Sequence, residues 1–210
     1  MMNGQMSPED IGQWILDAAS SELRDVQRKE VLAYLQDALS SEPSAELWYL
    51  VGNAYYHLWQ SPLEPDMAAD AIGALNQALR IDPTYEWARL YKVYLQFECE
   101  QFISCLADAR ALDRSWFLDS PVEWRAISAD EIEFACLVRL GIRTPRMLEL
   151  YHRILDLANP DDDDLWPYRP TIFAESFQVA CSAGYFADSD VSAMTLEVAN
   201  LMERVGPGGH

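Results

Sequence analysis

The side chains best suited to metal or acid–base chemistry are few and widely spaced in this chain of 210 residues. Four consecutive carboxylates, Asp161–Asp164, carry the oxygen ligands that a hard cation prefers. The run lacks the alternating ligand spacing, the glycine and the final glutamate of an EF-hand loop, so a solvated acidic loop is the favoured interpretation. The histidines, at positions 57, 152 and 210, are far apart.

Sequence motifs with a known catalytic mechanism are missing. The chain has no G-x-x-x-x-G-K-[ST] phosphate loop, no G-x-S-x-G elbow, no H-E-x-x-H pair and no Rossmann glycine fingerprint. Its four cysteines form no C-x2-C spacing, which favours free thiols in a reducing cytoplasm. We therefore expect a protein that is not an enzyme and that uses neither a metal nor a cofactor.

The net charge of the chain bears on which class of partner it can bind. The net charge of −19 argues against nucleic-acid binding, which needs a basic face, and favours a basic partner. Arginine is concentrated locally in one segment, at positions 139, 143, 146 and 153. A phosphate or acidic-peptide site there competes with ordinary helix-surface pairing, such as Glu149 with Arg153 at i, i+4, and the pairing is favoured.

The chain shows no targeting or membrane-spanning segment. The first ten residues lack a basic region followed by an apolar stretch, and no later segment approaches the roughly 18 uninterrupted apolar residues that a span requires. We expect a cytoplasmic protein that does not bind a membrane.

Helical repeats are indicated by a self-match. Sliding the sequence by 40 residues places residues 30–50 over 70–90 and pairs six identical residues, including Pro43 with Pro83. The two segments share an A-L-x-x-x-P ending, in which the proline stops a helix.

Residues 45–84 resemble one tetratricopeptide repeat. The first-helix pattern W-x2-L-G-x2-Y is matched by Trp48, Val51, Gly52 and Tyr55, and the second-helix pattern by Ala71, Leu75, Ala78 and Pro83. Seven additional residues around positions 60–66, with Pro62 and Pro65, indicate an extended loop between the two helices. Gly52 and Ala78 are expected at close helix contacts.

The remaining elements are also expected to be helices. Ser7 and Pro8 start a first helix, residues 86–97 and 101–112 form a third hairpin, and a capping box over residues 128–131 precedes another helix. Further helices are expected over 144–159, 170–184 and 189–205. The predicted fold is all-α, with about ten helices stacked as tetratricopeptide-like hairpins in a single compact right-handed array.

The predicted organisation has four parts. Disordered termini cover residues 1–6 and 206–210, tetratricopeptide-like hairpins cover 7–114, and divergent helical hairpins cover 115–205, packed on the same array.

The resemblance implies a peptide-binding groove. It also implies that the side chains of Tyr49, Asn53, Tyr56 and His57 point toward this groove. Family members that clamp a peptide carboxylate carry asparagine at the position of Asn53, but they carry lysine where this chain has Tyr49. This difference favours aromatic and hydrogen-bonding recognition, and Arg89 and Lys92 are the candidate sources of positive charge.

Three functions are compatible with these features. The first is a non-catalytic adaptor, scaffold or chaperone-like module that binds a peptide or a partner protein in the groove. The second is an acidic stoichiometric inhibitor, such as a bacterial immunity protein for a basic toxin. The third is an enzyme with its site in the divergent C-terminal half.

Overall fold

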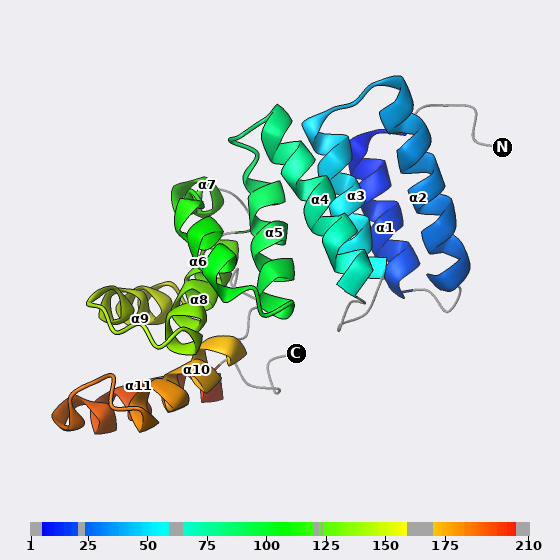
Figure 1. Cartoon of the computed structure of the whole chain (residues 1–210). Coiled ribbons are helices and arrows are strands. Elements are labelled where there is room, and N and C mark those ends of the chain that lie inside the picture. Colours follow the sequence, from blue (N-terminus) through cyan, green and yellow to red (C-terminus); the bar gives the residue numbers. More distant parts are fainter. Residues whose placement is uncertain are drawn as a thin grey trace. The chain divides into compact units, whose positions relative to one another are not determined.

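The computed structural model describes residues 6–20, 24–58, 65–119, 122, 124–158 and 170–204, most of which are helical (Figure 1). Over these ranges the chain forms eleven α-helices and no strand, which confirms the predicted all-α class. No helix in the described part is long and apolar enough to cross a membrane. Asp161–Asp164, His210 and the segments 1–5 and 206–210 lie outside the described residues.

The chain divides into two compact units, Met1–Gln101 and Phe102–His210. The sequence predicts a later boundary, at 114–115, and pairs residues 86–97 with 101–112 in one hairpin. These two helices fall in different units, and the second of them packs against a helix further along the chain.

The first unit is a row of antiparallel helices with α3 at its centre. Its elements are α1 (Pro8–Ser20), α2 (Arg24–Ser41), α3 (Ala45–Leu58), α4 (Pro65–Ile81) and α5 (Glu86–Glu98). Each helix packs on the next, and α3 also contacts α1 and α5 (Figure 1). This order of contacts is the one expected of hairpins stacked side by side.

Local sequence signals set the helix ends of this unit. Ser7 caps α1, because its hydroxyl accepts from the Asp10 backbone N–H at 3.2 Å and donates to the Asp10 carboxylate at 2.9 Å. Ser44 accepts from the Leu47 N–H at 3.1 Å and caps α3 in the same way. Within the segment 1–6, the Met6 N–H donates to the Tyr34 hydroxyl at 2.8 Å.

The close contact of α3 with α4 lies where the sequence predicts. Most of the loop expected over 60–66 falls outside the described residues, and Pro65, expected in that loop, is the first residue of α4. Gly52 is buried, and Ala78 is fully inaccessible to solvent. A Cβ atom added to Gly52 would lie 2.5 Å from Leu75 Cγ, inside the contact distance of two carbon atoms. A larger residue at position 52 would therefore have to displace the buried Leu75 side chain.

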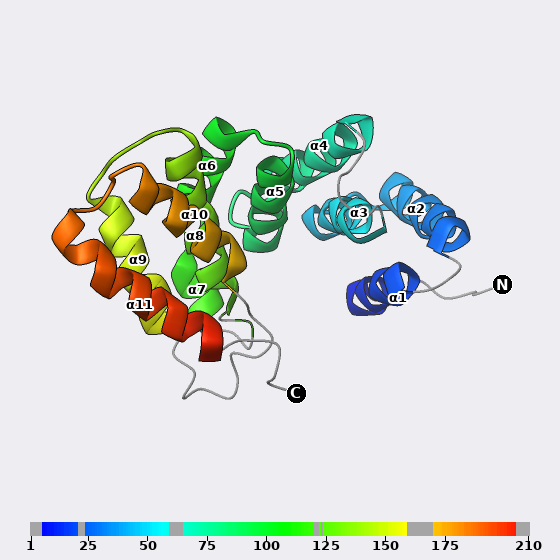
Figure 2. The ribbon, with the colours of Figure 1, turned by 90° about the horizontal axis from the view of Figure 1, so that it is seen from below.

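The second unit is built around α8 (Trp124–Arg139), which packs against α6 (Phe102–Ala111), α7 (Arg114–Leu118), α9 (Arg146–Leu157) and α10 (Thr171–Ser182) (Figure 2). The last helix, α11 (Asp188–Arg204), contacts α10. Every residue of α8 from Ala126 to Val138 is buried. A helix covered on all sides must bury whatever polar groups it carries.

The predicted capping box at residues 128–131 is wrong. α8 begins four residues earlier, at Trp124, so Ser128 and Glu131 lie in its buried interior. In a capping box the Glu131 carboxylate would accept from the Ser128 backbone N–H. It accepts instead from the backbone N–H of Phe173, in α10, at 2.7 Å. The short helix α7 was not predicted, although Asp113 caps it by accepting from the Ser115 N–H.

Two glycine substitutions test the α3–α4 contact. Gly52→Ala should lower the free energy of unfolding by about 1–3 kcal/mol, because the new methyl group overlaps the Leu75 side chain. Gly73→Ala is the matched control, since Gly73 lies in α4 with nothing within 4 Å of the added Cβ. It should raise stability by about 0.5–1 kcal/mol through lower chain entropy. Urea unfolding measures both, and a stabilised Gly52→Ala variant would contradict the observed packing.

Candidate functional site

The α3 helix packs one face against the hydrophobic core of the first unit and directs side chains from another face toward α5. Val51, Gly52 and Ala54 are buried, and Trp48 and Tyr55 pack partly buried against the core of α1, α2 and α4. Adjacent positions on a helix differ by about 100°, so the residues one step on from Trp48 and Tyr55 turn part of their surface toward α5, and the first of them also packs partly buried against the same core. These residues are Tyr49 and Tyr56.

Tyr49 and Tyr56 meet side chains of α5 and of the turn before it. The Tyr49 ring lies 5.5 Å from that of Tyr85 and 5.6 Å from that of Tyr91, and the Tyr56 ring lies 5.2 Å from Tyr91. His57 completes the group, with its Nε2 atom 3.2 Å from the Tyr91 hydroxyl. We call these five residues, Tyr49, Tyr56, His57, Tyr85 and Tyr91, the aromatic surface.

The rings of the aromatic surface are held in place and remain partly accessible. Tyr91 is 5% exposed and forms its centre, whereas the other four members are half-buried. Ring separations of 5–6 Å at steep angles are favourable aromatic geometry. The surface therefore presents pre-positioned ring edges and phenol groups.

Asn53 supports this surface from beneath. It is 5% exposed, and its Nδ2 donates to the Tyr49 hydroxyl at 3.3 Å. Its amide is thus used to orient Tyr49 and is not presented to solvent as a carboxylate clamp would require.

Carboxylates adjoin the aromatic surface. Tyr56 hydrogen-bonds the Glu98 carboxylate, whose pKa is nevertheless raised by burial. Burial, with the charges of Glu46 and Asp82, raises the pKa of Tyr85 to about 12. The Tyr85 phenol therefore stays protonated at neutral pH, next to acidic side chains.

The two predicted cationic residues do not form an open positive patch. Arg89 donates to the Pro83 carbonyl at 2.6 Å, its Nε lies 3.7 Å from the Glu86 carboxylate, and its side chain is 18% exposed. It is engaged with the start of its own helix. Lys92 is half-buried on α5.

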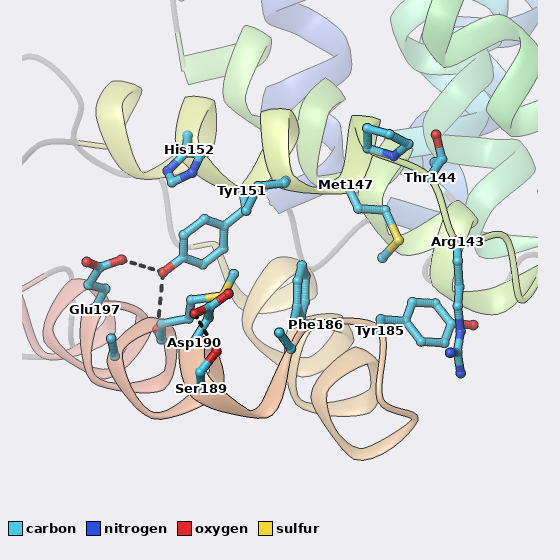
Figure 3. A pocket seen from close by; sticks show the side chains of 15 residues that line it. Arg143, Thr144, Met147, Tyr151, His152, Tyr185, Phe186, Ser189, Asp190 and Glu197 are labelled. Carbon is cyan, nitrogen blue, oxygen red and sulfur yellow. Dashed lines mark hydrogen bonds between the residues drawn. The ribbon is translucent and has the colours of Figure 1, made fainter.

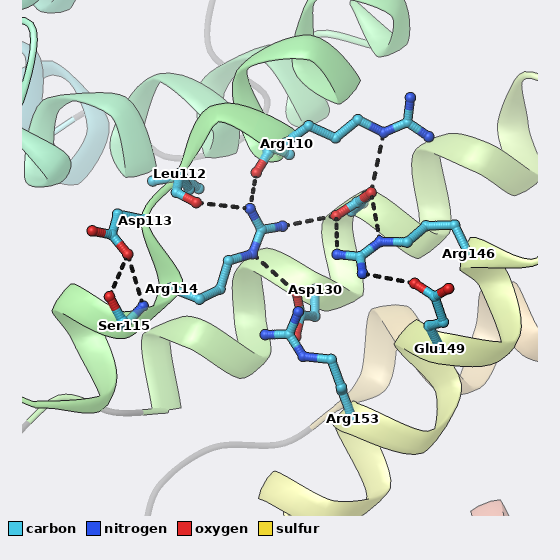
Figure 4. A network of polar contacts seen from close by, with 11 residues as sticks. Arg110, Leu112, Asp113, Arg114, Ser115, Asp130, Arg146, Glu149 and Arg153 are labelled. Carbon is cyan, nitrogen blue, oxygen red and sulfur yellow. Dashed lines mark hydrogen bonds and ion pairs between the residues drawn. The ribbon is translucent and has the colours of Figure 1, made fainter.

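In the second unit, the polar centre is a set of arginines around two buried carboxylates of α8 (Figure 4). Asp130 is fully buried and Glu133 is 1% exposed. Arg114 bridges them, with Nε 3.1 Å from Asp130 Oδ1 and Nη2 2.9 Å from Glu133 Oε2. It also donates to the carbonyls of Ala109 and Leu112.

Three further arginines complete this network. Arg146 contacts both Glu133 oxygens at 3.3 Å, Arg153 lies 3.0 Å from Asp130 Oδ2, and Arg110 lies 3.1 Å from Glu133 Oε1. Burial raises the pKa of Asp130, while Arg114 and Arg153 oppose that shift. The expected pairing of Glu149 with Arg153 is wrong, because Glu149 pairs with Arg146 at 3.1 Å and Arg153 turns to Asp130.

A pocket of about 660 Å³ opens between α9 and α11 (Figure 3). Met147, Leu148 and Tyr151 of α9 line one side, and Met194 and Glu197 of α11 line the other. The loop between α10 and α11 closes one end with Tyr185 and Phe186. The sequence contains no motif for this pocket, because its walls come from residues about 45 positions apart that only the fold brings together.

Among the described residues, no group of three or more histidine, cysteine, aspartate or glutamate side chains is placed to hold a metal ion. No protein-family model matches the chain, and no curated protein matches it at a significant level.

The arginine network predicts a large difference between two variants. Arg114→Met removes the bridge between two buried carboxylates, so the free energy of unfolding should fall by about 3–5 kcal/mol. Arg110→Met removes one contact of a guanidinium that is 48% exposed, and should cost less than about 1 kcal/mol. Urea unfolding followed by circular dichroism measures both losses. Equal losses for the two variants would show that Arg114 does not bridge a buried pair.

Proposed function

We propose that this protein is a non-catalytic interaction module of tetratricopeptide-like helical hairpins, which binds a peptide or a partner protein on the aromatic surface. The observation that carries the proposal is the half-buried group of Tyr49, Tyr56 and His57 packed on Tyr91, between helices α3 and α5. The contacts of α3 with α1 and α5 support it, because such stacking places first helices of successive hairpins side by side.

Partly exposed tyrosines are well suited to binding. Tyrosine is enriched among the residues that dominate binding energy, since its ring buries a large area and its hydroxyl forms hydrogen bonds. In the aromatic surface the neighbouring rings and the Asn53 amide already restrict the side chains. Little further conformational entropy is then lost when a partner binds.

The partner that fits this surface best is basic. Cationic side chains interact favourably with tyrosine, and Glu46 and Glu98 lie on the same two helices. The net charge of −19 would speed the approach of such a partner. A reducing cytoplasm is the proposed location, since all four cysteines are free thiols.

A second candidate function is stoichiometric inhibition of a basic protein, and the net charge is the observation that favours it. Salt separates the two candidates by degree. Inhibition that depends on charge neutralisation alone loses its affinity steeply as ionic strength rises, whereas a basic partner on the aromatic surface keeps the part of its affinity that comes from ring contacts.

Variants of the aromatic surface test the proposed function. Peptides would be selected from a random display library on the intact protein, and their Kd values measured by calorimetry. Tyr49→Ala and Tyr56→Ala should each weaken binding by about 5- to 30-fold, equivalent to about 1–2 kcal/mol.

Because both rings pack on Tyr91, these variants should also lose some stability, so Kd is compared only for the folded fraction. Asn76→Ala, on the exposed side of α4, is the control and should leave Kd unchanged. Peptide binding that survives both tyrosine changes within about twofold would exclude the aromatic surface as the binding site.

A further inference from the structure

The pocket between α9 and α11 has the size and lining of a small-molecule site. Its volume of about 660 Å³ lies within the usual range for such sites. Met147 and Met194 are buried in its walls, Phe186 is half-buried, and Leu148 at its edge is 46% exposed. Methionine side chains adapt easily to the shape of an apolar ligand.

One carboxylate in this lining is held in position by a buried phenol. Tyr151 is fully buried, and its hydroxyl donates to Glu197 Oε2 at 2.5 Å, with the Met194 carbonyl 3.3 Å away as a second acceptor. Figure 3 shows Tyr151 reaching from α9 to Glu197 on α11. Burial and the hydrogen bond to Glu197 both raise the pKa of Tyr151, so the phenol remains a donor.

Glu197 keeps an acceptor for a ligand. Its Oε2 atom accepts from Tyr151, and within the described part of the chain its Oε1 atom has no hydrogen-bond or ion-pair partner. A second carboxylate, Asp190, lies two helical turns earlier, about 10 Å away along α11. Asp190 accepts from the Ser189 hydroxyl through Oδ1 at 2.9 Å. Met194 lies between the two acids on the same helix face.

The single arginine of the lining does not neutralise these acids. The Arg143 guanidinium lies 4.7 Å from the centre of the Tyr185 ring and donates to the Ala183 carbonyl at 2.5 Å. Among the described residues it forms no ion pair with Glu197 or Asp190. The pocket thus combines an apolar interior with uncompensated negative charge.

We propose that this pocket binds a small organic amine, with the ammonium group on Glu197 and an apolar body over Met147, Met194 and Phe186. An ammonium donates three hydrogen bonds, and a bond to a carboxylate is about twice as strong as one between neutral groups. The site lies in the second unit, so it is independent of the aromatic surface and goes beyond the proposed function.

Three probes with one apolar body test the proposal: 4-phenylbutylamine, 4-phenylbutan-1-ol and 4-phenylbutyrate. Titration calorimetry on the full chain should give the amine a Kd at least about tenfold lower than that of the alcohol, and no binding of the carboxylate. Chemical shifts of the Met147 and Met194 methyl groups should change with the amine.

Variants locate the binding. Glu197→Gln should weaken the amine by about tenfold or more and leave the alcohol unchanged, because only the charge-assisted bond is lost. Glu203→Gln, an exposed acid of α11 outside the pocket, is the matched control and should have no effect. Ala193→Trp keeps the carboxylates and fills the pocket, so it should abolish binding even if Glu197→Gln fails to fold.

Several results would overturn the proposal. Equal affinity for amine and alcohol would show that the carboxylates do not recognise the ligand. Full binding by Ala193→Trp would place the amine elsewhere on the acidic chain. Binding of an acetylated, amidated lysine peptide without binding of the free amine would assign the pocket to a partner's side chain. None of these results depends on the tyrosines of α3 and α5.

Discussion

The close approach of Leu75 to Gly52 is the constraint on which the candidate binding surface depends. Because residue 52 has no Cβ, α4 packs directly on α3, and the rotation of α3 about its own axis is fixed. Trp48, Val51 and Tyr55 are then committed to the core side. Tyr49, which also packs against this core, and Tyr56 turn toward α5, where both rings contact Tyr91. A packing contact thereby determines which side chains form the aromatic surface.

The second unit is organised by the opposite kind of requirement, the need to pair buried charge. Asp130 and Glu133 are enclosed by the helices around α8, and unpaired carboxylates there would be very unfavourable. Arginines from α6, α7 and α9 supply the partners. A buried network of this kind can add little net stability, but each guanidinium has few positions from which it reaches its carboxylate. The placement of α9, and therefore one wall of the pocket between α9 and α11, follows from these pairs.

Features set by neighbouring residues could be predicted from the sequence. The cap at Ser7 and the tight contact at Gly52 depend on a few adjacent side chains or on a repeat pattern. The Ser128–Glu131 pattern fits a capping box equally well, but burial of the whole segment placed it inside α8. Local pattern cannot distinguish a helix start from a polar stretch of a buried helix when the charge partners lie elsewhere.

Long-range partners set the remainder of both sites, and they could not be predicted. Arg114 reaches carboxylates 16 and 19 residues away, and Tyr151 reaches Glu197 across 46 residues. The partner of Asn53 could not be predicted either. The repeat pattern predicts that its amide faces a ligand, whereas in the structure the amide is buried and donates to the Tyr49 hydroxyl. In each case the residue type is visible in the sequence, but its partner depends on the packing of helices.

The central claim is that a partner binds on the side of α3 and α5 that carries the tyrosines. Hydrogen–deuterium exchange of the full chain, alone and saturated with a peptide that it binds, tests this claim most directly. The account predicts slower exchange in residues 45–58 and 86–98, with residues 146–157 and 188–204 unchanged. Protection confined to the second unit, or absent from α3 and α5 at saturation, would contradict it.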